Sequence, residues 1–525
     1  MKQRELTVAL CVIWAVTLLY GEMVAYWLPS FSTCSWPHLH SSNSKVDGVS
    51  YAKIAVIADP QLMDKTSLPL APKSLALEVV QFYTDLYMRR AFLASVLPHK
   101  PDVILFLGDH FDGGPFLSDE EWQESLSRFN HIFALDKKGK HRDIQVYYLS
   151  GNHDIGYEFT HSRRPEVVNR YEKAFGPRNY RFTAGKVEFV AIDAQTLDAH
   201  RQENLASSTW EFVKNISKDD QSFPRVLLTH IPLYRRDWTD CGPNRNSEII
   251  NQRVTRAADN QIRYQNYISE ESSNSLLESI KPVLILSGHD HDQCTITHKS
   301  KFWPAKEHTV GTVSWQQGNL YPSFMLLSAS NSLLPNTSNP EEAVLTQLCF
   351  LPMQIFIYIW YLVLFVFTLL ALLLWPTSGV SFWNQLGHVK QLITSSFSRM
   401  KEKNEDLDCE YEMIWDAEGS MHLVKKASNT PMTRSSETTS IERGGAVIRP
   451  TARKNISQES EISVSVDNNA DIGGDHIAKT ALRTSKSWRK IGIQRLVRAF
   501  QMLCIIAAVN VPLYIILLFE DWIDQ

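Results

Sequence analysis

The stretch "DVILFLGDHFDGG", residues 102 to 114, joins a short apolar run to a turn rich in carboxylates and glycines. Residues 103–107 are all apolar, which is typical of a strand buried on both faces of a sheet. Asp109 follows where this strand would end, and Asp112 follows three positions later. The neighbouring glycines permit a tight turn that brings both side chains inward. The stretch therefore predicts a buried strand with a functional site at its carboxyl end.

The same arrangement recurs between residues 51 and 331. Six more apolar runs have the length of short strands: "KIAVIAD" from 53, "VYYLSGNHD" from 146, "VEFVAID" from 187, "RVLLTHIP" from 225, "PVLILSGHDH" from 282 and "SFMLLSA" from 323. Residues 73–97 have helical spacing and stop before Pro98. Parallel strands of an α/β sheet bind ligands beyond their carboxyl ends, so the polar residues after these runs are expected at one mouth.

Four ordered motifs carry a family resemblance: "GDHFD", "GNHD", "LLTH" and "GHDH", after a strand that ends on Asp59. Together they resemble the calcineurin-like metallophosphoesterase superfamily over residues 53 to 331. The resemblance implies an α/β fold, a four-layer metallophosphoesterase-type β-sandwich flanked by helices, to which transmembrane helices are added here. It also implies a metal-dependent phosphoric ester hydrolase, acting as a phosphodiesterase.

The resemblance assigns a role to each motif residue around two divalent metal ions. Asp109 bridges the ions; Asp59, Gln61 and His291 hold the first, and Asn152, His230 and His289 hold the second. His153 contacts the phosphate and protonates the leaving oxygen, while Asp112 orients that imidazole. Mixed nitrogen and oxygen ligands favour Mn, with Fe or Zn as alternatives. No protein nucleophile is needed.

Gln61 departs from the family pattern, in which a histidine is usual. An amide oxygen can coordinate a metal, but it is neutral and a poorer donor than imidazole. The site then either works with an exchangeable first metal or binds metal without turnover, and Gln61 could instead hydrogen-bond a neighbouring loop. Retention of His153 and Asp112 favours an active enzyme.

Three long apolar runs predict membrane segments, since a helix needs roughly 20 residues to cross a bilayer. The expected plan is an N-terminal anchor at 1–28, a linker at 29–50, a lumenal metallophosphoesterase domain at 51–335, a transmembrane helix at 348–375, a largely disordered cytosolic loop at 376–495 and a further transmembrane helix at 496–519. A cleaved signal peptide is the alternative for the first run. Basic residues flank the runs on the side assigned to the cytosol, which sets this orientation. Asn215, in an Asn-Ile-Ser sequon, then lies in the lumen.

The "DPQ" form at residues 59–61 resembles one branch of the superfamily, the membrane-anchored enzymes that act on GPI anchors. This resemblance implies removal of ethanolamine phosphate from a mannose of the glycolipid, in the endoplasmic reticulum or early Golgi membrane, during maturation and export. Two alternatives remain: a general lumenal phosphatase or phosphodiesterase, and a metal-binding cargo adaptor or receptor. The net charge of −4 and the lack of a basic stripe argue against a nucleic-acid partner. The oligomeric state is left open.

Two further pairs have alternative interpretations. Cys241 and Cys294 either form a disulfide in an oxidising lumen or are two buried thiols. Arg89 and Arg90, on the first predicted helix, either contact the phosphate or belong to a solvated face, and the solvated face is favoured.

Overall fold

The computed structural model describes residues 3–38, 50–135, 143–199, 204–246, 253–332, 340–375, 411–415, 421–425 and 475–523. The chain divides into two compact units, residues 1–372 with 502–525, and residues 373–501. The first unit contains both large sheets and every predicted site residue.

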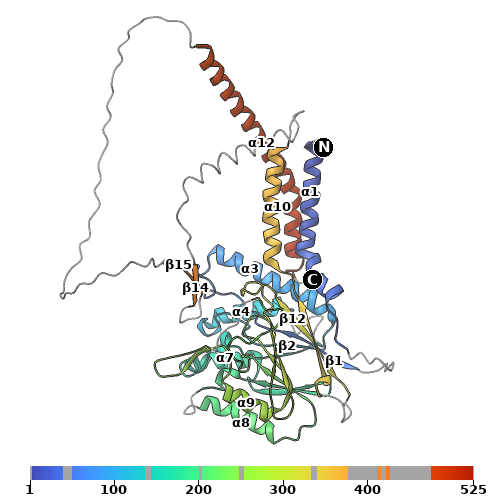
Figure 1. Cartoon of the computed structure of the whole chain (residues 1–525), viewed down its shortest axis with the longest axis vertical. Coiled ribbons are helices and arrows are strands. Elements are labelled where there is room, and N and C mark those ends of the chain that lie inside the picture. Colours follow the sequence, from blue (N-terminus) through green and yellow to red (C-terminus); the bar gives the residue numbers. More distant parts are fainter. Residues whose placement is uncertain are drawn as a thin grey trace, which may run out of the picture. The chain divides into compact units, whose positions relative to one another are not determined.

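The first unit is built on two mixed sheets (Figure 1). One has the order β13-β12-β1-β2-β3 and the other the order β10-β11-β9-β6-β5-β4. The strands of the first are β1 (Tyr51–Ile57), β2 (Val103–Phe106), β3 (Gln145–Tyr148), β12 (Ser323–Ser330) and β13 (Val344–Phe350). Those of the second are β4 (Tyr180–Ala184), β5 (Val187–Ile192), β6 (Arg225–Thr229), β9 (Pro282–Ser287), β10 (Cys294–His298) and β11 (Ala305–Thr309). Because β1, β2 and β3 are parallel, and so are β5, β6 and β9, their carboxyl ends share an edge within each sheet.

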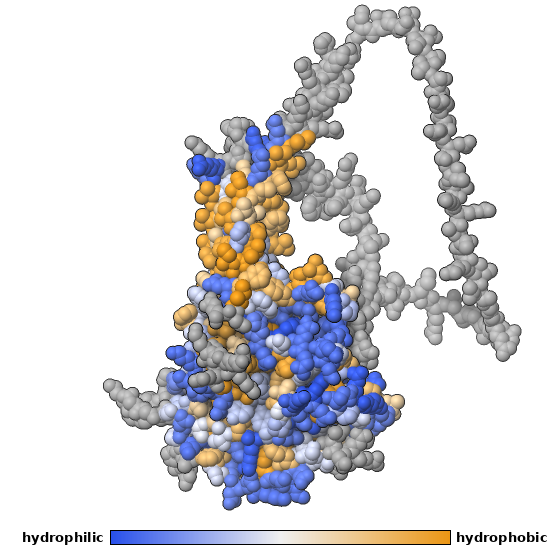
Figure 2. All heavy atoms as spheres, turned by 180° about the vertical axis from the view of Figure 1, so that it is seen from behind, coloured by the Kyte–Doolittle hydropathy of each residue, from blue (hydrophilic) through white to orange (hydrophobic). Residues whose placement is uncertain are grey.

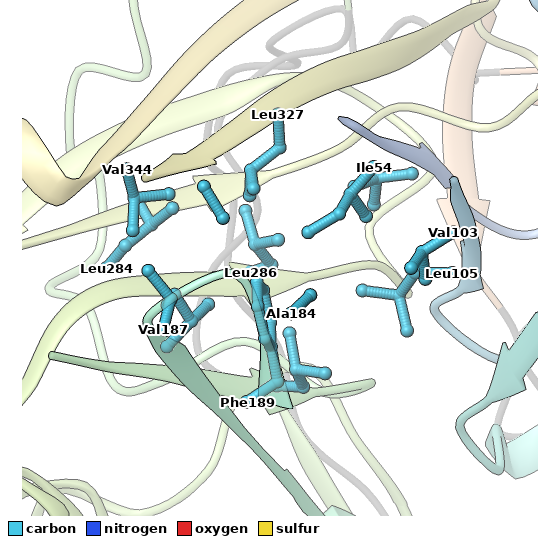
Figure 3. Packing of buried hydrophobic residues seen from close by; sticks show 14 of the residues in the cluster. Ile54, Val103, Leu105, Ala184, Val187, Phe189, Leu284, Leu286, Leu327 and Val344 are labelled. Atoms are coloured by element: carbon cyan, nitrogen blue, oxygen red, sulfur yellow. The ribbon is translucent and has the colours of Figure 1, made fainter. Parts of the chain in front are cut away.

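The two sheets pack face to face around one apolar core (Figure 3). Ile54 and Val103 come from the first sheet, and Phe189 and Leu286 from the second, and all are almost fully buried. Burying a side chain of this size contributes about 1.5–3 kcal/mol. All seven apolar runs singled out in the sequence are strands, because each has apolar residues on both of its faces.

Helices cover the outer faces of both sheets. The first sheet is covered by α3 (Leu75–Arg90) and α4 (Asp119–Ile132), whose buried residues join the outward side chains of β1 and β2 in a second core. The second sheet is covered by α8 (Asn204–Lys218) and α9 (Glu270–Ile280). The order helix, sheet, sheet, helix confirms the predicted four-layer α/β sandwich.

Shorter elements surround the site edge of the sandwich. They are α5 (Asn152–Ile155), α6 (Glu158–His161), α7 (Pro165–Phe175) and the hairpin of β7 (Val254–Arg256) with β8 (Ile262–Gln265).

Three helices are long and apolar enough to cross a membrane: 4–33, 354–374 and 492–520. The first runs through α1 (Gln3–Leu19), α2 (Ala25–Leu28) and two π-helical turns (Tyr20–Val24 and Pro29–Thr33), the second is α10 (Gln354–Leu374), and the third is the end of α12 (Asp475–Glu520). Figure 2 shows hydrophobic side chains gathered over these helices and mainly polar ones over the sandwich.

Several boundaries differ from the sequence expectation. The first helical run continues to Thr33, inside the expected linker. The first sheet includes β13, which lies beyond the expected domain end at residue 335 and whose burial is mixed. Its last residues, 348–350, belong to the run expected as a transmembrane helix, which begins at Gln354 instead. A disulfide joins Cys34 to Cys349, and this ties the end of the first membrane helix to the end of β13.

The interpretation of Arg89 and Arg90 as a solvated face is wrong. Both side chains are buried, with 3% and 2% exposure. Arg90 pairs with the carboxylate of Glu22 and donates to the carbonyl of Leu517, while Arg89 donates to the carbonyl of Asp521. These partners lie at the ends of the membrane helices rather than among the motif residues.

The second unit, residues 373–501, contains the segment expected to be a largely disordered loop. It contains a hairpin of β14 (Tyr411–Trp415) and β15 (Met421–Lys425). Helix α12 begins at Asp475, so residues 475–495 are helical rather than part of a loop. The rest of the expected loop, residues 376–410, 416–420 and 426–474, lies outside the described residues.

Candidate metal centre

The site lies at the carboxyl ends of five strands. Asp59 follows β1, Asp109 follows β2, Asn152 follows β3, His230 follows β6, and His289 and His291 follow β9. The chain must turn sharply at the end of each buried strand, and this turn presents the next side chain to the shared edge.

Five residues of the centre have left-handed backbone conformations: Asp59 (φ 49°), Gln61 (39°), Asp109 (52°), His289 (71°) and His291 (58°). Such a conformation costs a non-glycine residue on the order of 1–3 kcal/mol and persists only where the surroundings hold it. Strain concentrated at one place is typical of a functional site.

Two groups of side chains have ligand atoms within 4.8 Å of one another. One group is Asp109, His230 and His289, and the other is Asp59, Asp109 and His291. Asp109 belongs to both, and a carboxylate can give one oxygen to each of two ions. The structure therefore brings together the residues expected around a bridging Asp109.

Asn152 and Gln61 complete the two groups. Asn152 Oδ1 lies 3.2 Å from His230 Nε2, beside the group formed by Asp109, His230 and His289. Gln61 Nε2 lies 3.2 Å from Asp109 Oδ2, and Gln61 Oε1 is buried without a hydrogen-bond partner among the described residues. A buried acceptor without a partner is costly unless something else satisfies it, and a cation would do so. The donor set fits two divalent ions.

Hydrogen bonds select the ring nitrogens that face the centre. His230 Nδ1 lies 2.7 Å from the carbonyl of Leu107, so Nδ1–H donates there and Nε2 faces Asp109 at 3.2 Å. His289 Nε2 lies 3.0 Å from the carbonyl of Gln265, which leaves Nδ1 for an ion. Metal-binding histidines usually anchor their second nitrogen in this way.

The electrostatics of the centre favour neutral rings at His289 and His291 and an ionised carboxylate at Asp109. Burial lowers the pKa of His289 to about 3 and that of His291 to about 4, so both rings are free to coordinate at neutral pH. Burial raises the pKa of Asp109, but the charges of His230 and His153 outweigh it, and the pKa falls below its ordinary value. Burial dominates at Asp59 and raises its pKa to about 8. A cation beside Asp59 would favour its ionised form.

His153 and Asp112 lie at the opening of the site. His153 Nδ1 is 2.6 Å from the carbonyl and 3.3 Å from the carboxylate of Asp112, and the side chain is 37% exposed. Its backbone N–H donates to Asp109 Oδ1 at 2.8 Å. Desolvation lowers the pKa of His153, but the carboxylates of Asp109 and Asp112 outweigh this effect and raise it to about 10. Because Nδ1 is bound to Asp112, Nε2 is the ring nitrogen left for a substrate, and the raised pKa keeps the ring protonated at neutral pH.

The loops of Asp109 and His153 approach so closely that residue 151 must be glycine. A Cβ on Gly151 would lie 2.0 Å from Asp109 Oδ1. The two loops are also joined by Asp154, whose carboxylate accepts from the backbone N–H groups of His110 and Gly151 and contacts His110 Nδ1 at 2.8 Å. His110 is therefore a buried structural residue.

Sequence reasoning missed two contacts of the His289 loop. The carbonyl of Gln265 in β8 orients His289, and nothing in that short polar hairpin indicates this role. Arg245 forms a bidentate ion pair with Asp290 at 2.8 and 3.0 Å. The disulfide between Cys241 and Cys294, left open by the sequence, is present and joins the same two segments. Asp290 lies between two predicted ligands, His289 and His291, and this position is the sequence feature that could have indicated its supporting role.

The fold and the centre define a metal-dependent phosphoesterase with a dinuclear type of site. The family model for calcineurin-like phosphoesterases matches residues 52–293, and the chain belongs to this family. It is 30% identical over 355 residues to Cell division control protein 1 of Saccharomyces cerevisiae, covering 65% of this chain and 68% of that protein. It is also 30% identical over 370 residues to Metallophosphoesterase 1 of Rattus norvegicus, covering 66% and 87%. Among solved structures, a sulfate thiohydrolase of Thermus thermophilus aligns with 62% of each chain at a TM-score of 0.27 and 12% identity.

Proposed function

We propose that this membrane phosphoesterase removes ethanolamine phosphate from a mannose of GPI anchors, with two Mn ions, on the lumenal side of the endoplasmic reticulum or early Golgi membrane. The observation that carries the proposal is the direct attachment of the catalytic domain to the membrane helices. An enzyme held at the bilayer shares a surface with a lipid-anchored substrate, so the search for that substrate is two-dimensional.

The membrane helices connect to Gln61, a predicted ligand of the first metal, through two intervening residues. Gln316 Nε2 lies 3.4 Å from the carbonyl of Gln61, and the neighbouring Trp315 packs 5.8 Å from Tyr358, one turn into α10. A short path of contacts thus joins a predicted ligand to a membrane helix. This proximity favours a substrate whose phosphate lies close to the bilayer surface.

A lumenal orientation is supported by covalent chemistry. The disulfides Cys34–Cys349 and Cys241–Cys294 both lie in the catalytic unit, and disulfides persist in oxidising compartments such as the endoplasmic reticulum. Asn215 is exposed on α8, as a glycosylated sequon must be. Loss of a glycosidase-sensitive mass shift in Asn215→Gln would support this orientation, and an unglycosylated wild type would weaken it.

The chain's own residues account for the phosphoester chemistry around the metals. Divalent ions held by the two ligand groups would lower the pKa of water and neutralise charge on the phosphate oxygens. His153, held through Nδ1 by Asp112, directs Nε2 towards the substrate. As the water oxygen bonds to phosphorus, the bond to the leaving oxygen breaks, and the proton on Nε2 moves to that oxygen. The proton lost by water restores the imidazolium.

The test uses the full chain in lipid nanodiscs with Mn and a GPI anchor that carries ethanolamine phosphate. Release of ethanolamine phosphate is expected in the wild type. It should be lost in His153→Ala and Asp109→Ala, and after treatment with a chelator. His308→Ala is the matched control, because this histidine lies on β11 outside the ligand groups.

Cells without the protein should accumulate anchors that retain ethanolamine phosphate. If they do not, and the purified chain hydrolyses soluble phosphodiesters equally well, the general lumenal phosphodiesterase is the better assignment. If metal binds but no phosphoester is cleaved, the adaptor interpretation replaces both.

A further inference from the structure

Besides the face that packs on the first sheet, helix α3 has a second apolar stripe, and this stripe has two environments. Leu75, Val79, Phe82 and Tyr83 recur at the i, i+4, i+7 and i+8 positions and therefore share one face. The second half of this face packs on the membrane helices. The first half is uncovered: Leu75 is 76% exposed and Val79 is 44% exposed.

The covered half contacts the same end of the second and third membrane helices. Phe82 lies 5.1 Å from Trp522 and 6.0 Å from Phe519, at the end of α12. Tyr83 lies 6.4 Å from Tyr358, one turn into α10. The face that contains Leu75 and Val79 is therefore directed towards the side of the molecule where the bilayer lies.

The C-terminal end of α3 is also bound to the first membrane helix, which fixes the position of α3 along that helix. Arg90 pairs with Glu22, and Tyr87 packs 5.6 Å from Tyr26. In Figure 1, α3 runs crosswise to α10 at the end of the bundle nearest the sheets, with its first turns extending beyond the bundle. At 1.5 Å per residue, Leu75 lies roughly 10 Å along the helix from Phe82. That distance places it beside the bundle, next to lipid.

We propose that the first half of α3 is an interfacial membrane-binding surface. Its occupant is the boundary between headgroups and acyl chains of the same bilayer that the three helices cross. Continuity argues for lipid, because the stripe passes without interruption from contacts with membrane helices to an exposed apolar surface. The preceding stretch "SLPLAPKSL", residues 67–75, has three leucines at 68, 70 and 75, one basic residue and no acid, which suits a headgroup layer.

This surface is coupled to the centre through α3 itself. Gln81 Nε2 donates to the carbonyl of Met63 at 3.0 Å, two residues after Gln61. Thr84 Oγ1 donates to Gln316 Oε1 at 3.3 Å, and Gln316 contacts the carbonyl of Gln61. Immersion of α3 would therefore hold the Gln61 loop at a fixed depth. The consequence for substrate choice rests on the proposed function, whereas the immersion itself does not.

The immersion test uses the full chain in phosphatidylcholine nanodiscs. Nitroxide labels are attached to Leu75→Cys or Val79→Cys, in a background where Cys11, Cys409 and Cys504 are serine. Phe302→Cys is the matched control, because Phe302 is also apolar and 48% exposed but lies before β11, at the opposite edge of the second sheet from the site. Labels at 75 and 79 should be at least tenfold more accessible to oxygen, relative to an aqueous nickel chelate, than the label at 302.

Equal accessibility at all three labelled positions would overturn the proposal. Protection of the two α3 labels from both reagents would also overturn it, because a protein segment would then cover the stripe. In the activity arm, Leu75→Glu with Val79→Glu should slow hydrolysis of a lipid-tethered phosphodiester at least tenfold and change a soluble aryl phosphodiester less than twofold. Immersed labels without activity on any lipid-tethered substrate would count against the proposed function alone.

Discussion

Arg245 and Asp290 form an ion pair whose removal should affect stability and metal binding together. Their side chains are only 5% and 2% exposed, and the guanidinium contacts both carboxylate oxygens. Asp290 separates His289 from His291, and both histidines have strained backbones. Breaking a buried pair by removing one partner leaves an uncompensated charge and typically costs about 3–5 kcal/mol.

Arg245→Met should therefore lower the free energy of unfolding by about 3 kcal/mol, or about 6 °C in Tm for a domain of this size. Because the carboxylate would no longer hold its loop, the affinity for Mn should fall about 10- to 100-fold, as for other residues that support metal ligands. Replacing both partners, in Arg245→Met with Asp290→Asn, removes the unpaired charge and should recover part of the stability. Metal affinity should remain weak in this double variant.

The assay is thermal unfolding of the full chain in detergent, with and without chelator, combined with Mn titration of the metal-free protein at a temperature where every variant is folded. Arg236→Met is the control, since Arg236 is exposed on the same segment. Wild-type affinity in Arg245→Met would refute the reasoning about the loop. A double variant that unfolds as easily as Arg245→Met would refute the pairing.

Three other perturbations have definite expected outcomes. Gln61→His should retain the first metal more tightly during dialysis against chelator, and unchanged metal content and activity would mean that Gln61 is not a ligand. Glu22→Gln removes the buried anionic partner of Arg90 and leaves only the half-exposed carboxylate of Asp521, at 3.3 Å, so it should lower the unfolding free energy by up to about 3 kcal/mol, measured by thermal unfolding in nanodiscs; no change would show that the Glu22 pair is not formed. Burial lowers the pKa of His161 to about 4, so the unfolded state binds the extra proton first, and stability falls by up to about 3 kcal/mol as pH drops from 6.5 to 4. His161→Gln should reduce that loss, and an identical pH profile would contradict the burial argument.

The sequence predicts the strands that are buried on both faces and little of what surrounds them. Continuous apolar runs mark β1, β2 and β9 because both of their faces meet a protein layer. By contrast, β10 has alternating burial and polar residues, so its short pattern resembles a loop.

The centre follows from the same logic, since the motif residues all lie at strand ends. The membrane contacts do not follow from it. Arg90 has its partner Glu22 inside a distant apolar run, and Cys34 bonds to a cysteine 315 residues away. A pattern read over one helical turn or one strand contains no information about such pairs.

The central position of β1 has a consequence for biosynthesis. This early strand, which delivers Asp59, has β2 on one side and the much later β12 on the other, with Tyr51 opposite Ser330. Until β12 emerges from the ribosome, one edge of β1 has no partner and can pair with other chains. We therefore expect nascent chains that stop before β12 to depend on chaperones and to be degraded, even when their first membrane helix has inserted.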